Sequence, residues 1–239
     1  MNTAATSKAI TTLLIFDLDG TLVDSAGQIF EALNQACRES GFEEIPEYLF
    51  AERLGLPVQS IIADLNLSSF DQTNLINSFR LNLSARIEES NLLFDGVEDF
   101  LKLAKLLKYS IAIATSKPTY LAKLVVKNSA LINYIDFVQG TVNFPAKPAP
   151  DVILKCLQEF KPSTAIMIGD RIEDIMAANA CGIESIGIAQ SHHTVKDFIG
   201  SRASLAFNNF LEMTENSEKI WSLLGPRNEG NSVSGTLRT

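Results

Sequence analysis

Short, largely apolar runs alternate along the chain with stretches in which apolar residues recur at helical spacing. The runs cover residues 13–16, 110–114, 165–168 and 184–188, with a weaker one at 134–138. A run without polar alternation is typical of a strand that is buried on both faces of a parallel sheet. Between the runs, the spacing predicts helices over residues 97–107, 120–126 and 172–180. This alternation predicts an α/β fold with a doubly wound parallel sheet.

Residues 25–90 interrupt the alternation, because they show helical periodicity and no strand pattern. An ordinary crossover between strands needs far fewer residues, which favours an inserted helical cap. The alternative is that part of the stretch is simply the first crossover helix. We therefore predict a core domain from residues 1–24 and 91–213 and a cap domain from residues 25–90. Residues 214–239, which are rich in Ser, Asn, Gly, Glu and Thr, are predicted to form a disordered tail.

Two carboxylates follow the first apolar run directly. Strand alternation places Asp17 and Asp19 on the same side, and Gly20 permits a sharp exit of the backbone. In an open parallel sheet, binding sites lie beyond the carboxyl ends of the strands. Two close carboxylates repel each other unless a cation lies between them, so the pair favours a divalent metal site. The alternative is a solvated pair of turn-forming aspartates.

Three further groups of polar residues lie at or near the ends of later apolar runs. Asp170 and Asp174 are one helical turn apart, so both can face a metal such as Mg²⁺ or simply complement a helix dipole. Thr115 and Ser116 precede a predicted helix and can cradle an anion or cap that helix. Lys147 lies in a proline-rich loop, where it can neutralise a phosphate or remain a surface lysine.

The order acid pair, hydroxyl, lysine, acid pair resembles that of the haloacid dehalogenase superfamily of phosphotransferases. The order extends over residues 13–190, and the insert is similar to the helical C1 cap of the phosphoglycolate phosphatase-like subfamily. The resemblance implies a phosphatase that uses Mg²⁺ to hydrolyse a small, phosphoglycolate-like phosphomonoester. Alternatives within the superfamily are a 5′-nucleotidase, an inorganic pyrophosphatase and a phosphomutase. A receiver-like or other non-catalytic binding module is the alternative outside enzymes.

The resemblance also implies roles for individual residues. Asp17 would attack phosphorus and form an aspartyl-phosphate, and Asp19 would protonate the leaving oxygen and then activate water. The dehalogenase branch lacks the second aspartate, which favours phosphate chemistry here. Mg²⁺ would be held by Asp17, the backbone carbonyl of Asp19 and Asp170, with Asp174 acting through a water or by orienting the other ligands. The transferring phosphoryl oxygens would be bound by Thr115, the Ser116 amide and Lys147.

Some positions depart from the family pattern or concern the substrate rather than the reaction. Ser116 stands where many phosphoglycolate-type phosphatases have Asn. Arg53 begins a segment, residues 53–57, that resembles the cap's substrate loop, so Arg53 would pair with a substrate carboxylate or second phosphate. The alternative is a helix end with Arg53 in solvent. Arg80 and Arg86 are interpreted as solvated helix residues without an assigned role.

Composition narrows the class of partner. Hydrophobic residues make up 46% of the 239 residues, and the net charge is −8, which argues against nucleic acid as a partner. No apolar run is long enough for a membrane span, and three scattered cysteines do not suggest disulfides or zinc. We expect a cytoplasmic protein, a monomer or homodimer, that binds a small phosphorylated metabolite.

Overall fold

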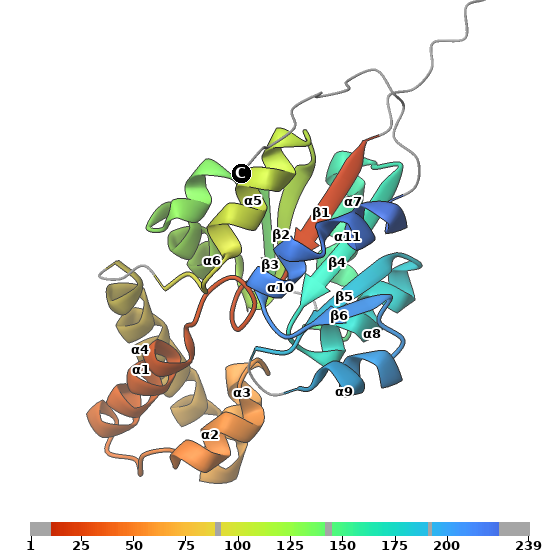
Figure 1. The fold of residues 1–239 in the computed structure, drawn as a ribbon. Coiled ribbons are helices and arrows are strands. Elements are labelled where there is room, and N and C mark those ends of the chain that lie inside the picture. Colours follow the sequence, from red (N-terminus) through yellow and green to blue (C-terminus); the bar gives the residue numbers. More distant parts are fainter. Residues whose placement is uncertain (1–10, 89–91, 142–144, 191–192, 225–239) are drawn as a thin grey trace, which may run out of the picture.

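A parallel sheet of six strands forms the centre of the molecule (Figure 1). The computed structural model describes residues 11–88, 92–141, 145–190 and 193–224. The strand order is β3-β2-β1-β4-β5-β6, and every neighbouring pair is parallel. The strands are β1 (Thr12–Phe16), β2 (Ser110–Pro118), β3 (Phe137–Thr141), β4 (Thr164–Gly169), β5 (Glu184–Ile188) and β6 (Leu205–Phe207). The predicted parallel α/β sheet is therefore confirmed.

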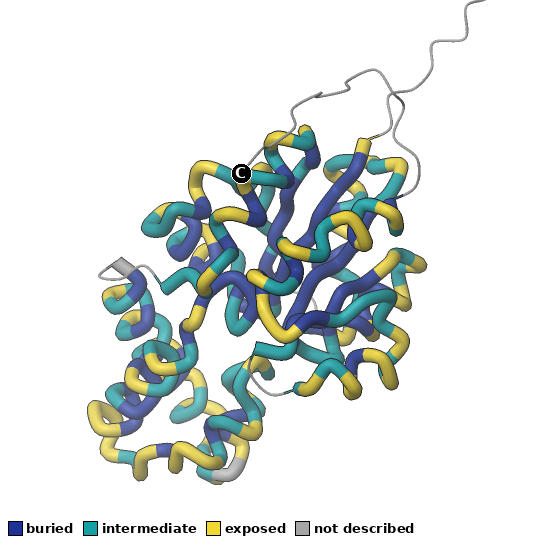
Figure 2. Tube along the Cα trace, in the orientation of Figure 1, coloured by how far each residue is buried: buried dark blue, intermediate teal, exposed yellow. Residues whose placement is uncertain are grey.

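Strand β1 is buried on both faces, as its unbroken apolar run predicts. Leu14 and Phe16 contribute to the larger apolar cluster, whereas Leu13 and Ile15 contribute to a second cluster on the opposite face. Burying each such side chain contributes about 1.5–3 kcal/mol, so β1 is fixed at the centre of the sheet. Figure 2 shows the central strands buried along their length, while the helices expose their outer faces.

Helices cover both faces of the sheet. On the face of the larger cluster lie α5 (Val97–Leu106), α6 (Thr119–Lys127), α10 (Phe210–Glu215) and α11 (Ser217–Leu223). On the other face, α7 (Asp151–Phe160) and α8 (Ile172–Cys181) bury apolar side chains against the second cluster. A 3₁₀ turn, η2 (Ala130–Asn133), precedes β3, and α9 (Val195–Gly200) packs beside β5 and β6. Among the described residues, no helix combines the length and apolar character that a membrane crossing requires.

Three predicted boundaries are wrong. The strand expected at residues 110–114 continues to Pro118. The strand expected at residues 134–138 begins only at Phe137, because Tyr134 ends the 3₁₀ turn and the Asp136 carboxylate accepts a hydrogen bond from the backbone N–H of Ile111. The tail expected from residue 214 is folded through residue 224. Helix α11 buries Ile220, and Trp221 stacks on Phe100 with ring centroids 5.8 Å apart. Residues 225–239 lie outside the described part of the chain.

The described residues between β1 and α5 contain helices and no named strand. They form α1 (Ala26–Glu39), α2 (Glu47–Arg53), α3 (Val58–Ile61), the 3₁₀ turn η1 (Ala63–Leu65) and α4 (Ser69–Glu88). Helices α1 and α4 pack along each other, and the whole group lies beside the sheet rather than on one of its faces (Figure 1). This arrangement supports our proposal that residues 25–90 are an inserted cap, although residues 89 and 90 are not described.

Candidate active site

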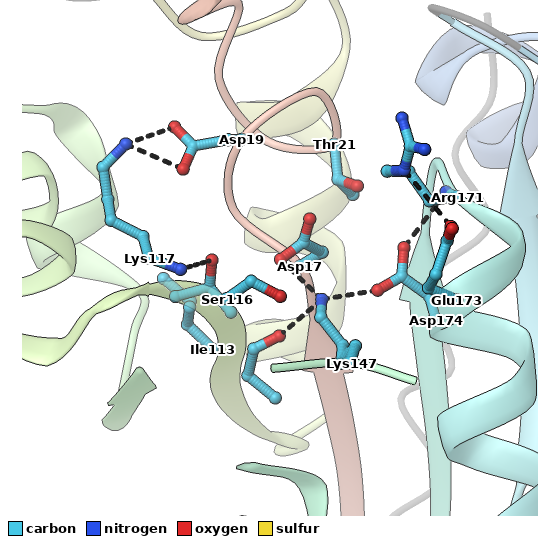
Figure 3. Close-up of polar contacts among 12 residues, drawn as sticks. Asp17, Asp19, Thr21, Ile113, Ser116, Lys117, Lys147, Arg171, Glu173 and Asp174 are labelled. Atoms are coloured by element: carbon cyan, nitrogen blue, oxygen red, sulfur yellow. Dashed lines mark hydrogen bonds and ion pairs between the residues drawn. The ribbon is translucent and has the colours of Figure 1, made fainter. Parts of the chain in front are cut away.

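The predicted chemical groups come together at the carboxyl ends of the central strands. Asp17 follows β1, Thr115 lies in the last half of β2, and Asp170 follows β4. Because β1 lies between β2 and β4, this is the point at which the sheet changes its winding direction, where ligands bind in open α/β sheets. Figure 3 shows that Lys147, from the loop before α7, reaches into the same place.

Lys147 connects two of the carboxylates. Its Nζ lies 2.7 Å from Oδ1 of Asp17 and 2.5 Å from Oδ1 of Asp174, and it donates a hydrogen bond to the carbonyl of Ala114 at 3.0 Å. Only 4% of the side chain is exposed. Burial disfavours the ammonium, but the two carboxylates outweigh this effect and raise the pKa of Lys147 above its ordinary value. The lysine therefore supplies a fixed positive charge.

Three buried carboxylates form a group that can hold a metal ion. Each of Asp17, Asp170 and Asp174 offers an oxygen, and these oxygens lie within 4.8 Å of one another. Burial raises the pKa of Asp174 to about 7; Lys147 opposes the rise, and the charges of Asp17 and Asp170 add to it. Oδ1 of Asp17 is buried, and beyond its ion pair with Lys147 no hydrogen bond to it is found in the described part of the chain. Oxygen ligands and mutual repulsion among the carboxylates both fit a hard divalent cation.

Two glycines make room for these carboxylates. Gly20 has φ +82°, and a Cβ there would overlap the carboxylate of Asp170. A Cβ at Gly169 would overlap the carboxylate of Asp174. The hydroxyl of Thr21 also donates to Oδ1 of Asp170 at 2.6 Å. The loop after β1 therefore shapes the acidic group as well as contributing Asp17 to it.

Asp19 lies apart from the three carboxylates and faces a different lysine. Both of its oxygens accept hydrogen bonds from Nζ of Lys117 at 2.7 Å (Figure 3). Oδ1 also accepts a hydrogen bond from the Ser25 hydroxyl at 2.6 Å. The Asp19 carboxylate is not part of the acidic group, so the predicted metal ligand at this position remains its backbone carbonyl. Lys117 was missed by sequence reasoning. The available signal was its place in β2, two residues after Thr115 and therefore on the same side of the strand.

The predicted anion cradle lies next to Asp17. The hydroxyl of Thr115 accepts a hydrogen bond from the backbone N–H of Lys117 at 3.2 Å, and the carbonyl of Ser116 accepts one from the Thr141 hydroxyl at 2.9 Å. Thr115 and Ser116 both line a cavity together with Asp17. Their binding of phosphoryl oxygens stays a prediction that this placement permits.

The cavity lies between the core and the cap and has a volume of about 260 Å³. Arg53 is absent from its described lining, since its guanidinium donates to the carbonyl of Ser60 at 2.8 Å. Arg80, to which we assigned no role, lines the cavity instead. On the core side, Arg171 donates to the carbonyl of Leu54 in the cap loop, and a Cβ at Gly55 would overlap the Arg171 side chain. The structure thus brings Arg80, and not Arg53, to the cavity.

Comparison with known proteins places the chain in a family. The sequence profile of the family described as haloacid dehalogenase-like hydrolase matches residues 14–188, which is more than half of the chain. The chain is 28% identical over 210 residues to the probable phosphatase IndB of Dickeya dadantii, covering 84% of this chain and 91% of the relative. It is also 28% identical over 197 residues to a phosphoglycolate phosphatase of Vibrio vulnificus, covering 76% of this chain and 85% of the relative.

A solved structure agrees with this placement. The haloacid dehalogenase-like hydrolase SP0104 of Streptococcus pneumoniae superposes with a TM-score of 0.76 at 27% identity, covering 87% of this chain and 98% of the other. The profile match includes Asp17, Thr115 and Asp170. The chain belongs to the haloacid dehalogenase-like hydrolase family.

Proposed function

We propose that this protein is a Mg²⁺-dependent phosphatase that hydrolyses a small phosphomonoester through an aspartyl-phosphate on Asp17. The observation that carries the proposal is the position of the Asp17 carboxylate, which lines the cavity and lies 2.7 Å from the Lys147 ammonium. A carboxylate nucleophile needs access to the substrate, and a transferring phosphoryl group needs positive charge beside it. The relatives named as phosphatases support the same reaction.

The first half of the reaction follows from the two aspartates. An oxygen of Asp17 forms a bond to phosphorus while the ester P–O bond breaks, and Asp19 gives a proton to the departing alcohol oxygen. In the structure Asp19 is held by Lys117 and Ser25, so it must leave at least one of these partners to reach the leaving oxygen. Lys147, the Thr115 hydroxyl and the Ser116 amide would meanwhile bind phosphoryl oxygens.

The second half releases phosphate and restores the enzyme. Asp19 takes a proton from water, the water oxygen attacks phosphorus, and the bond between phosphorus and Asp17 breaks. Asp17, Asp170 and Asp174 would hold the magnesium ion, with the Asp19 carbonyl as the further predicted ligand. When bound, the ion would supply positive charge that stabilises the negative phosphoryl oxygens and reduces repulsion among the carboxylates.

Orthophosphate release from 4-nitrophenyl phosphate tests the proposal. We expect turnover with Mg²⁺, loss of turnover on chelation and recovery when Mg²⁺ is added back. Asp17→Asn should lower kcat on the order of 10⁴-fold or more while the far-ultraviolet circular dichroism stays unchanged, because the nucleophile is lost and the fold is not. Normal turnover by Asp17→Asn, or activity that is indifferent to chelation, would refute the proposal.

A further inference from the structure

The cap side of the cavity is almost entirely apolar. Helices α1, α3 and α4 and the loop between α2 and α3 contribute the apolar side chains of Ile29, Leu54, Leu56, Pro57, Val58, Ile61, Phe79 and Leu83. Of the cap residues in the described lining, only Gln59 and Arg80 have polar side chains. On the core side, Pro118 and Leu121 continue the apolar surface beyond the polar groups around Asp17.

Arg80 is the one charged group of the cap at this cavity, within the described lining. It lies on α4 between Phe79 and Leu81, and its side chain is half-buried. No hydrogen bond or ion pair of its guanidinium is found in the described part of the chain. By contrast, Arg38 pairs with Glu44 at 3.0 Å and Arg171 pairs with Glu173 at 3.2 Å. A half-buried guanidinium without a bound anion is a candidate binding site for an anionic group. Burial weakens its hydration, while its five N–H donors remain available for hydrogen bonds.

The volume of the cavity indicates how large the bound molecule is. A volume of about 260 Å³ is much larger than the space that one or two waters need, and it approaches the lower end of small-molecule pockets. Apolar walls favour apolar ligands, because the affinity of a ligand rises roughly fourfold for each of its methylene groups that leaves water. A two-carbon substrate with its charge beside the phosphoryl group would leave most of this apolar surface unused.

From these observations we infer the substrate class: the phosphomonoester of an alcohol with a mainly apolar body and a carboxylate at its far end. The phosphoryl end would meet Asp17 and Lys147, the body would contact Phe79, Leu83 and their apolar neighbours, and the carboxylate would pair with Arg80. The inference rests on the proposed phosphatase activity and adds the identity of the group that is released. The reaction would yield orthophosphate and a hydroxy acid.

A matched series of alkyl phosphates tests the apolar part of the inference. Ethyl, butyl and hexyl phosphate all release a primary alcohol, so their intrinsic reactivity is alike. Differences in kcat/KM among them therefore reflect contacts of the alkyl chain with the cavity. Hexyl phosphate has four more methylene groups than ethyl phosphate, so we expect kcat/KM to rise by at least about 10-fold, and by about 250-fold if all four groups leave water. Phe79→Ala should lower kcat/KM for hexyl phosphate about 10-fold and lower kcat/KM for ethyl phosphate much less. Equal values along the series, or a preference for 2-phosphoglycolate over the hexyl esters, would overturn the inference.

Arg80 is tested with hexyl phosphate and 6-phosphonooxyhexanoate, which differ at the far end of the chain. We expect the ratio of kcat/KM for 6-phosphonooxyhexanoate to kcat/KM for hexyl phosphate to be about 10 or more in wild-type protein and to fall to about one in Arg80→Gln. Arg38→Gln, which removes a cap arginine from an exposed ion pair, is the matched control and should keep the preference. An unchanged preference in Arg80→Gln would overturn the role of Arg80.

The same assays separate failure of this inference from failure of the proposed function. If 4-nitrophenyl phosphate and every alkyl phosphate release no orthophosphate in the presence of Mg²⁺, the phosphatase proposal itself is wrong. If they are hydrolysed without regard to chain length or carboxylate, the phosphatase proposal stands and the inferred substrate class is wrong.

Discussion

The base of the site, meaning the charged cluster of Asp17, Lys147 and Asp174, and the cap-side wall of the cavity differ in what holds them in place. At the base, Asp17, Asp174 and Lys147 are buried ionisable side chains whose positions are fixed by contacts of 2.5–2.7 Å. On the wall, Phe79 and Leu83 are held by apolar contacts, which have no preferred direction. The core therefore determines which bond is broken, and the cap determines which molecules fit. Damage to the base should affect chemistry and stability together, whereas damage to the wall should affect substrate choice.

The largest effect in this comparison is expected from Asp19→Asn, which leaves the nucleophile and the wall intact. Asn cannot move the proton, so steady turnover should fall about 10²- to 10⁴-fold. With 4-nitrophenyl phosphate the leaving group departs without a proton, so a burst of one 4-nitrophenolate per protein should remain before slow hydrolysis. Stopped-flow absorbance measures the burst. A variant that shows neither a burst nor reduced turnover would contradict the role of Asp19 in both half-reactions.

Lys147→Met tests whether the stability of the base depends on the positive charge that Lys147 places beside the carboxylates. Removing the ammonium leaves the carboxylates of Asp17 and Asp174 buried without their partner, which should lower the free energy of unfolding by about 3–5 kcal/mol. Added Mg²⁺ should recover part of the loss, because it binds the same oxygens. Urea unfolding with and without Mg²⁺ makes the measurement.

Lys105→Met is the matched control for that experiment. Lys105 also forms a short ion pair, at 2.6 Å to Asp136, but its side chain is 30% exposed. Its removal should change the free energy of unfolding by only about 0–1 kcal/mol and should not respond to Mg²⁺. Equal losses for the two lysines would show that burial of the ions at the base is not what sets their importance.

The smallest effect is expected where the cap loop contacts the core. Gly55 has φ +86° and lies against the Arg171 side chain, whereas Gly41 has φ +74° with open space around it. Both Gly→Ala changes carry the backbone cost of about 1 kcal/mol, but only Gly55→Ala also displaces Arg171. We expect Gly55→Ala to raise KM severalfold with hexyl phosphate and Gly41→Ala to leave it unchanged. Identical KM values would mean that the contact with Arg171 does not position the cap.

The sequence was sufficient for those parts of the molecule that depend on local patterns. The apolar runs predicted the central strands because burial on both faces excludes polar alternation, and the end of each apolar run marked Asp17, Thr115 and Asp170. Strand β6 was missed because it has three residues, of which only Phe207 is fully buried. Helix α7 was also missed, although its apolar residues Val152, Ile153 and Cys156 carry the helical signal.

The missing site residues depend on contacts between distant segments. Lys117 acquires its importance from Asp19, which lies 98 positions earlier and meets it only because β1 and β2 are paired side by side in the sheet. Arg80 lines the cavity because of the particular rotation about its own axis in which α4 packs against α1. The helical periodicity of residues 69–88 does not determine that rotation. Arg53 has the residue type expected for anion binding, but the fold turns its guanidinium to the carbonyl of Ser60.

Chemical trapping of the phosphorylated residue tests the central claim most directly. Protein quenched in acid during turnover of 4-nitrophenyl phosphate, with Asp19→Asn used to accumulate the intermediate, is reduced with borohydride and analysed by peptide mass spectrometry. Reduction of an aspartyl-phosphate gives homoserine, and we predict it at position 17 alone, with no such product in Asp17→Asn. Homoserine at the position of another aspartate would contradict the account. So would steady turnover by the wild-type protein with no homoserine in the wild-type protein or in Asp19→Asn.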